Sequence, residues 1–251
     1  MSGPFGRSTS VTRVFTAAIL VPSPPLLVPE LAGAAAAETA SLRDAVAVAA
    51  KALSALSSEW VAVGAGATTV DVPSEAQGTY LGYGVDIRIT LRPGHAENPD
   101  PELPLAALTA GWIRGTWAPD AVVDARILAA DLPVERCAEY GAALRDFLDR
   151  DDEPRGLVIV ADGANTLTAK APGAFDPRAE GVQARVDAAL ESGDRDALLA
   201  LEPGLCNQLG LGGRVPWQVL AGVFDAPPSS CRTLYSAAPY GVAYHVGEWR
   251  P

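Results

Sequence analysis

Two nearly uninterrupted apolar runs stand out from the mixed polar and apolar pattern of the chain. Residues 14–21 read VFTAAILV and end at a proline, while residues 156–163 read GLVIVADG and end in a polar turn. Apolar runs of this length are typical of strands that are buried on both faces of a sheet. We therefore predict two interior strands here, and a third, shorter one in WVAVGAG at residues 60–66.

Helical periodicity separates these strands. Between residues 38 and 56, apolar side chains recur every three or four positions, which predicts an amphipathic helix. Asp176 followed by Pro177 is a helix start signal. Further helices are expected at residues 103–114, 134–148, 194–201 and 215–223, and further strands at 85–91, 121–128, 231–237 and 241–249. The alternation predicts an α/β fold of three layers, α/β/α, with a mostly parallel, mixed central sheet.

The domain organisation follows from the same pattern. We expect residues 1–13 to form a flexible N-terminal segment and residues 14–251 to form a single domain. The polar, proline-rich segment at residues 92–104 is expected to be the main loop that extends from this domain. The apolar run at 14–21 is too short to cross a membrane, so we expect no membrane partner.

Composition narrows the classes of partner. The 251 residues carry a formal net charge of −11, which disfavours binding to a phosphate backbone, so we expect no nucleic acid. The three cysteines, Cys137, Cys206 and Cys231, are far apart and show no CxxC spacing. This spacing argues against a disulfide framework or a zinc site. We expect the cysteines to be buried packing residues in a reduced, cytoplasmic protein.

The loops that follow the buried strands are the places to look for a site, because ligands of open α/β sheets bind outside the carboxyl ends of the strands. These loops span residues 22–30, 64–69 and 162–174. The first contains VPSPPLLVPEL, which resembles the PHPPLL-type N-terminal motif of the LigB-like superfamily of class III extradiol ring-cleavage dioxygenases. The stretches GLVIVADGANTLTAKAPGAFDPRAE, GRVPWQVLAGV and APYGVAYHVGEW resemble the versions found in actinobacterial proteins. Residues 70–150 carry no recognisable resemblance.

The resemblance implies a non-haem Fe(II) site made of two histidines and a carboxylate, with a further histidine assisting proton transfer. Such a set leaves open positions for a catechol and dioxygen. This chain departs from the pattern at several positions. Ser23 stands at the first histidine position, and GAGATT in the second loop has no histidine. In the third loop, VADGANT replaces an SGDLSH-like run, so that Asp162 survives while Asn165 or Thr166 falls at the histidine position.

Asp162, Asn165 and Thr166 form the best polar cluster, since residues at the end of a buried strand face the expected pocket. Alternatively, Asp162 and Asn165 only satisfy backbone groups in the turn. With Ser23 and Lys170 they are our pocket candidates, Lys170 being the cation nearest in sequence, with Arg178 as a second one.

The chain has only two histidines, His95 and His245. His95 and Glu97 form an HxE pair that could bind a metal or be a solvated surface pair, and His245 in AYHVGEW could titrate or be a hydrogen-bonded strand residue. These two histidines and Glu97 are the substitute metal ligands that the sequence offers.

The favoured hypothesis is a pseudoenzyme that has lost the iron ligands and binds a small polar or anionic molecule without a cofactor, or serves as a structural partner. The alternative is an aromatic ring-opening dioxygenase that holds Fe(II) through His95, Glu97, His245 or Asp162. The resemblance also implies a homo-oligomer, since family members assemble with copies of themselves or with a small second chain.

Overall fold

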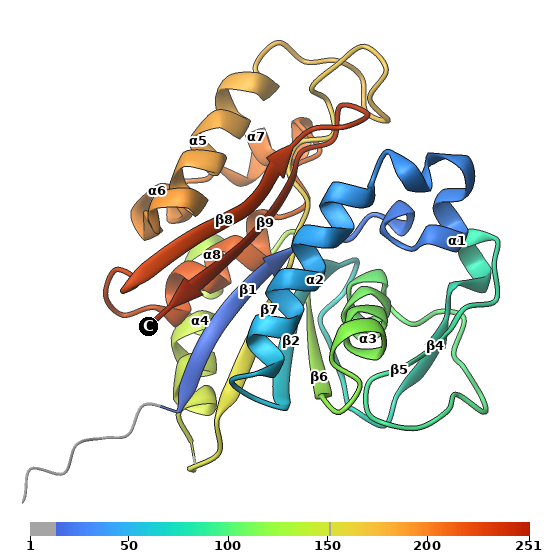
Figure 1. Cartoon of the computed structure of the whole chain (residues 1–251). Helices are drawn as coiled ribbons and strands as arrows, with labels where there is room; N and C mark the ends of the chain where they lie inside the picture. Colours follow the sequence, from blue (N-terminus) through green and yellow to red (C-terminus); the bar gives the residue numbers. More distant parts are fainter. Residues whose placement is uncertain (1–13, 151) are drawn as a thin grey trace, which may run out of the picture.

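A seven-stranded sheet organises the fold in the computed structural model of the chain, which describes residues 14–150 and 152–251 (Figure 1). The strand order is β3-β6-β2-β7-β1-β9-β8, and β6, β2, β7 and β1 run parallel to one another while β3, β9 and β8 pair antiparallel. The strands are β1 (Phe15–Val21), β2 (Glu59–Gly66), β3 (Val70–Val72), β6 (Val122–Ala129), β7 (Arg155–Val160), β8 (Ser230–Ala237) and β9 (Tyr244–Arg250). The predicted mostly parallel, mixed sheet is confirmed.

Helices cover both faces of the sheet and make three layers. On one face lie α2 (Ala40–Ser54) and α3 (Leu105–Trp117), and on the other α4 (Val134–Leu148), α5 (Ala179–Ser192), α6 (Arg195–Leu199), α7 (Pro203–Gln208) and α8 (Arg214–Val223). A four-residue helix, α1 (Pro29–Ala32), follows the proline-rich loop. The helices expected around residues 38–56, 103–114, 134–148, 194–201 and 215–223 are all present.

The core divides into two apolar clusters because side chains of a strand alternate between the faces of the sheet. In β7, Val158 and Val160 pack in the α2–α3 layer, whereas Leu157 and Ile159 pack in the layer of α4, α5 and α8. Both sets are buried, which explains why this strand reads as a continuous apolar run.

Two predictions need correction. Residues 85–91 do not join the main sheet: only β5 (Arg88–Thr90) is a strand, and it pairs with β4 (Gln77–Thr79) in a separate two-stranded sheet. Helix α5 begins at Ala179, and Asp176 caps the turn before it, accepting a hydrogen bond from the N–H of Arg178. The predicted segment 1–13 lies outside the described residues.

Candidate functional site

Ser23 and Asp162 meet where two neighbouring parallel strands end. Each lies two residues beyond its strand, Ser23 after β1 and Asp162 after β7. The Ser23 N–H donates to Oδ1 of Asp162 at 2.8 Å, and the Ser23 hydroxyl donates to Oδ2 at 2.7 Å. Burial raises the pKa of Asp162, while the two hydrogen bonds from Ser23 oppose this shift. One serine therefore occupies both oxygens of the only carboxylate that the family resemblance retains.

The other pocket candidates serve mainly to shape the loop after β7. The Thr166 hydroxyl donates to the carbonyl of Leu209 at 3.0 Å, and the carbonyl of Asn165 accepts from the N–H of Gly173 at 3.0 Å. Lys170 is exposed. Arg178 forms an ion pair with Asp176, so its charge is engaged locally. The Thr166 side chain thus satisfies a backbone carbonyl, and the Asp162 side chain accepts from the backbone N–H of Ser23, whereas the bond of Asn165 joins backbone atoms only.

The two histidines lie in different environments. His95 and Glu97 are exposed and border a cavity of about 210 Å³ beside β4 and β5. His245 is only 4% exposed, and it shares a strand face with Trp249, whose indole N–H donates to the carbonyl of Leu190 in α5. Its Nδ1 has no hydrogen-bond partner, and desolvation lowers its pKa to about 4. Over residues 14–150 and 152–251, no three His, Cys, Asp or Glu side chains gather as a metal would require.

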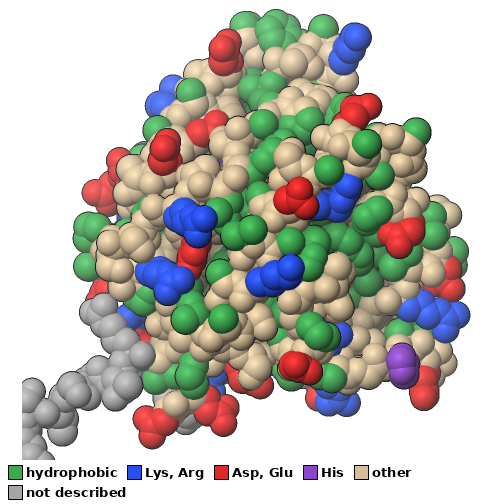
Figure 2. Space-filling model, in the orientation of Figure 1, with side chains coloured by type: hydrophobic (Ala, Val, Ile, Leu, Met, Phe, Trp, Pro, Cys, Tyr) green, Lys and Arg blue, Asp and Glu red, His purple; other side chains and the backbone are tan. Residues whose placement is uncertain are grey.

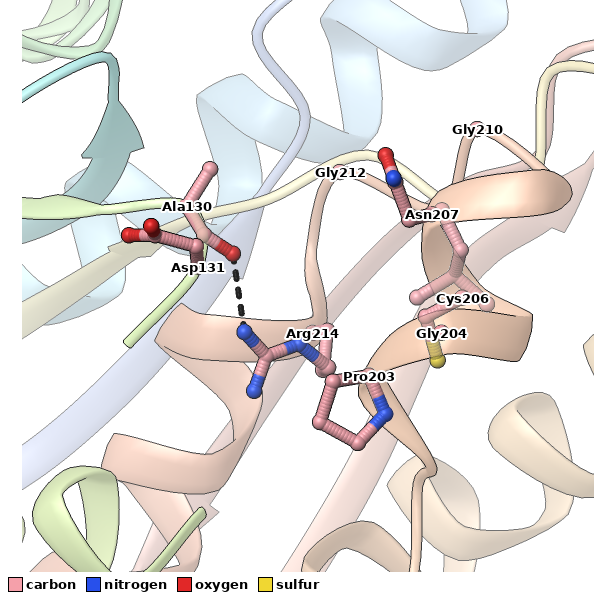
Figure 3. A pocket seen from close by; sticks show the side chains of 10 residues that line it. Ala130, Asp131, Pro203, Gly204, Cys206, Asn207, Gly210, Gly212 and Arg214 are labelled. Atoms are coloured by element: carbon pink, nitrogen blue, oxygen red, sulfur yellow. Dashed lines mark hydrogen bonds between the residues drawn. The ribbon is translucent and has the colours of Figure 1, made fainter. Parts of the chain in front are cut away.

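A cavity of about 440 Å³ lies at the same edge of the sheet, on the side of α7 and α8 (Figure 3). Ala130 and Asp131, just after β6, form one wall. Cys206 and Asn207 of α7 and the glycine-rich turn before α8 form the other, and Arg214 projects between the two.

Arg214 is the cation of this cavity and is only 3% exposed, while the other charged lining residue, Asp131, is exposed. Its Nη1 donates to Oε1 of Gln218 at 2.9 Å, and its Nη2 donates to the carbonyl of Ala130 at 2.8 Å. The adjacent Gly213 N–H donates to the carbonyl of Asp162 at 2.7 Å, which ties the start of α8 to the end of β7. The cavity and the Ser23–Asp162 pair are thus neighbours through the backbone.

The sequence pattern did not single out this cavity, because the rule that ligands bind at strand ends pointed to the loop after β7. A usable signal was present in LGLGGR at residues 209–214, a glycine-rich turn that leads directly into a helix and carries a cation at its first helical position. Glycine-rich turns before helices are a common setting for anion binding.

The cysteines behave as packing residues. Cys137 and Cys206 are buried, Cys231 is partly buried, and burial raises the pKa of all three thiols. For Cys206 the charge of Arg214 works in the opposite direction, with a smaller effect. A raised pKa disfavours the thiolate, so none of these side chains is set up as a nucleophile.

On the face shown in Figure 2, acidic and basic side chains are interspersed with apolar ones. No helix within the described part of the chain has the length and apolar character needed to cross a membrane.

Comparison with known proteins supports the fold. The structure is similar to the crystal structure of an uncharacterized protein, JW3007, from Escherichia coli K12, with a TM-score of 0.55. The similarity covers 94% of this chain and 100% of the other, at 13% sequence identity, and at that identity it establishes the α/β architecture alone. No protein-family model and no curated protein matches the chain.

Proposed function

We propose that this protein is a cytoplasmic relative of the LigB-like class III extradiol ring-cleavage dioxygenases that has lost the iron site and binds a small polar molecule. Two observations support the relationship: the VPSPPLLVPEL motif directly after the first strand, and an α/β fold in which that motif lies at the carboxyl end of the parallel strands.

The hydrogen-bonded pair of Ser23 and Asp162 carries the proposal. An iron site of the implied type needs two imidazoles and a carboxylate on one face. The corresponding positions here hold hydroxyl, amide, glycine and alanine groups, and the hydroxyls of Ser23 and Thr166 donate to Asp162 and to a backbone carbonyl. Both carboxylate oxygens accept hydrogen bonds from Ser23. This donor set does not fit Fe(II), so we derive no oxygen chemistry from it.

Binding of a small molecule is supported by the cavity at this edge. Its volume of about 440 Å³ falls in the usual range for small-ligand sites, and its position outside the carboxyl ends of the strands is where such folds hold their ligands. The polar side chains that line it, Asp131, Asn207 and Arg214, can orient a ligand without a metal.

The test combines metal analysis with a ligand screen. Metal-stripped protein is titrated anaerobically with Fe(II) and Zn(II), desalted and analysed for metal, and then screened by thermal unfolding against a panel of small polar metabolites. We expect no stoichiometric metal and at least one compound that stabilises the protein saturably. Stoichiometric iron that is lost in His95→Ala or His245→Ala would overturn the proposal in favour of a ring-opening dioxygenase with substitute ligands.

A further inference from the structure

We propose that the cavity at the start of α8 binds the oxyanion group of a small molecule, a phosphate or a carboxylate, with Arg214 as its cationic partner. This inference rests on the proposed small-molecule function and names the chemical class of the ligand.

The first argument is the unbalanced charge of Arg214. An arginine that is 3% exposed is expected to be paired with a carboxylate, because burial of an uncompensated charge is costly. Both acceptors of Arg214 are neutral, an amide oxygen and a backbone carbonyl. Among the described residues, no carboxylate forms an ion pair with it. No direct ion pair therefore balances its charge, and the nearest recorded carboxylate interaction is the Coulombic one with Glu202.

The second argument is the position of Arg214 at a helix N-terminus. Backbone N–H groups in the first turn of a helix have no partner within the helix and give that end a partial positive charge. No acceptor in the described chain takes the N–H of Arg214 or Val215, and the first turn contains no acidic residue. A buried guanidinium therefore shares one helix end with unpaired N–H groups, and an anion would stabilise both.

The nearby acidic side chains do not supply that anion. Asp131 borders the cavity, but its carboxylate is turned away from Arg214 (Figure 3). Glu202 is occupied as the cap of α7, where it accepts hydrogen bonds from the N–H groups of Gly204 and Leu205. Both residues are exposed. The charge of Arg214 helps to lower the pKa of Glu202, so this carboxylate lies within electrostatic range, but neither acidic side chain forms an ion pair with Arg214. The cavity therefore leaves room for an anion in direct contact with the guanidinium.

The other residues that line the cavity limit the polarity and the size of the rest of the ligand. Pro203, Cys206 and Leu211 present apolar surface, and Asn207 adds one neutral polar side chain. With a volume of about 440 Å³, the cavity suits a compact oxyanion attached to a small, mostly apolar body.

The first experiment measures anion binding by the full chain. Thermal unfolding and calorimetric titration are carried out with inorganic phosphate and, separately, with acetate, at constant ionic strength. We expect one of the two to raise the unfolding midpoint saturably, and the identity of the active anion distinguishes a phosphate site from a carboxylate site. Arg214→Gln is expected to weaken the apparent affinity at least tenfold. The matched control is Arg114→Gln, another buried arginine that does not line this cavity, which should retain the response.

A gain-of-function variant keeps the test decisive if Arg214→Gln does not fold. Gly212 is exposed, lines the cavity and has open space where a Cβ would be placed. Gly212→Glu should supply a tethered carboxylate, raise the unfolding midpoint without added anion and abolish the response to phosphate or acetate. Gly212→Ala is its neutral control.

Three results would overturn the inference: no response to either anion, an unchanged response in Arg214→Gln, or an unchanged response in Gly212→Glu. If both anions fail while a neutral compound from the metabolite panel still stabilises the protein, the anion site is wrong and the proposed binding function stands. Stoichiometric iron would instead remove the proposed function itself.

Discussion

Two arginines of this protein are almost equally buried but lie at opposite ends of their helices. Arg114, 6% exposed, is in the last turn of α3, and its Nη1 donates to the carbonyls of Pro119 and Ala121 at 3.1 and 3.4 Å. Arg214, 3% exposed, is the first residue of α8, and its acceptors are also neutral.

The difference lies in what surrounds each charge. The C-terminus of a helix has a partial negative charge and unpaired carbonyls, so it stabilises the cation of Arg114. The N-terminus has the opposite charge, so it does not stabilise Arg214. Burial lowers the pKa of Arg114, an effect that Asp120 opposes. Arg114 therefore lies at a helix end that favours its charge, although its buried Nε has no hydrogen-bond partner, whereas Arg214 lies at a helix end that favours an anion.

The largest effect is expected from moving α8 itself. Gly141 of α4 packs against α8 so closely that an added methyl group would clash with the carbonyl of Val219 and lie 2.7 Å from Cα of Gly222. Gly141→Ala should lower the free energy of unfolding by about 3 kcal/mol, as overpacked helix contacts do. Chemical denaturation measures the loss.

The matched change near Arg114 is Gly111→Ala, where the added methyl group would clash with Ile89 and lie 3.1 Å from Leu91. It should cost similar stability but leave the response to phosphate or acetate intact, whereas Gly141→Ala should weaken that response. Equal responses in the two variants would contradict the assignment of the anion site to α8.

Replacement of each arginine by methionine compares the two directly. Arg114→Met removes a cation from a favourable helix end and leaves two carbonyls without their donor, so we expect a loss of about 2 to 3 kcal/mol. Arg214→Met, measured without added anion, should cost less, about 1 kcal/mol. It also leaves Oε1 of Gln218 and the carbonyl of Ala130 without their donor, but it removes a buried cation from a helix end that does not favour it. Denaturation in anion-free buffer provides the comparison, and a greater loss for Arg214→Met would reverse our assignment.

His245 extends the comparison to a neutral buried group in the same layer as Arg214. Its pKa of about 4 lies below the ordinary value of 6.5, so the folded state takes up a proton less readily than the unfolded chain. Stability associated with this group is present above pH 6.5 and is lost as the pH falls towards 4. The loss should reach about 2 kcal/mol at pH 5.

His245→Phe keeps a similar shape and removes the titration. Relative to the wild type, it should therefore gain stability as the pH falls from 7 to 5, as measured by denaturation across that range. A parallel pH dependence in the two proteins would show that His245 is not protected from protonation.

The smallest effect is expected at Asp162. Because burial raises its pKa, its contribution to stability is present at low pH and declines as the pH rises through the raised pKa. Asp162→Asn can retain the hydrogen bonds with Ser23 while removing the buried charge. We expect it to gain about 1 kcal/mol over the wild type at pH 8 and less at pH 5.

The anion response of Asp162→Asn should be unchanged, since residue 162 is hydrogen-bonded to the start of α8 through its backbone carbonyl. An altered response would mean that the carboxylate takes part in the site, and the contrast between the Ser23–Asp162 pair and Arg214 would then need revision.

The sequence was sufficient to predict most of the architecture, because periodicity reports burial directly. The helix at residues 134–148 has the predicted limits, and the two apolar runs lie side by side as β1 and β7. The three-residue strands β3, β4 and β5 were missed or misassigned because such short segments depend on their partners more than on their own pattern.

The candidate site was harder to predict. The end-of-strand rule led to the neighbourhood of Asp162, but it did not show that Ser23 would use both carboxylate oxygens. The environment of Arg214 depends on Ala130 and Gln218, one far from it in sequence and one turn away in α8. The sequence pattern alone therefore does not predict which buried cations form no ion pair.

The place of β1 in the sheet has a consequence for folding. This strand is the first of the described chain but lies between β7 and β9, and β9 is the last. Its antiparallel pairing to β9 must therefore wait until all the residues between them have been synthesised. Long-range pairings of this kind slow folding and prolong the exposure of unpaired strand edges. The sheet should therefore be completed only after β9 has been synthesised, and truncation within β9 should harm folding more than the loss of so few residues would suggest.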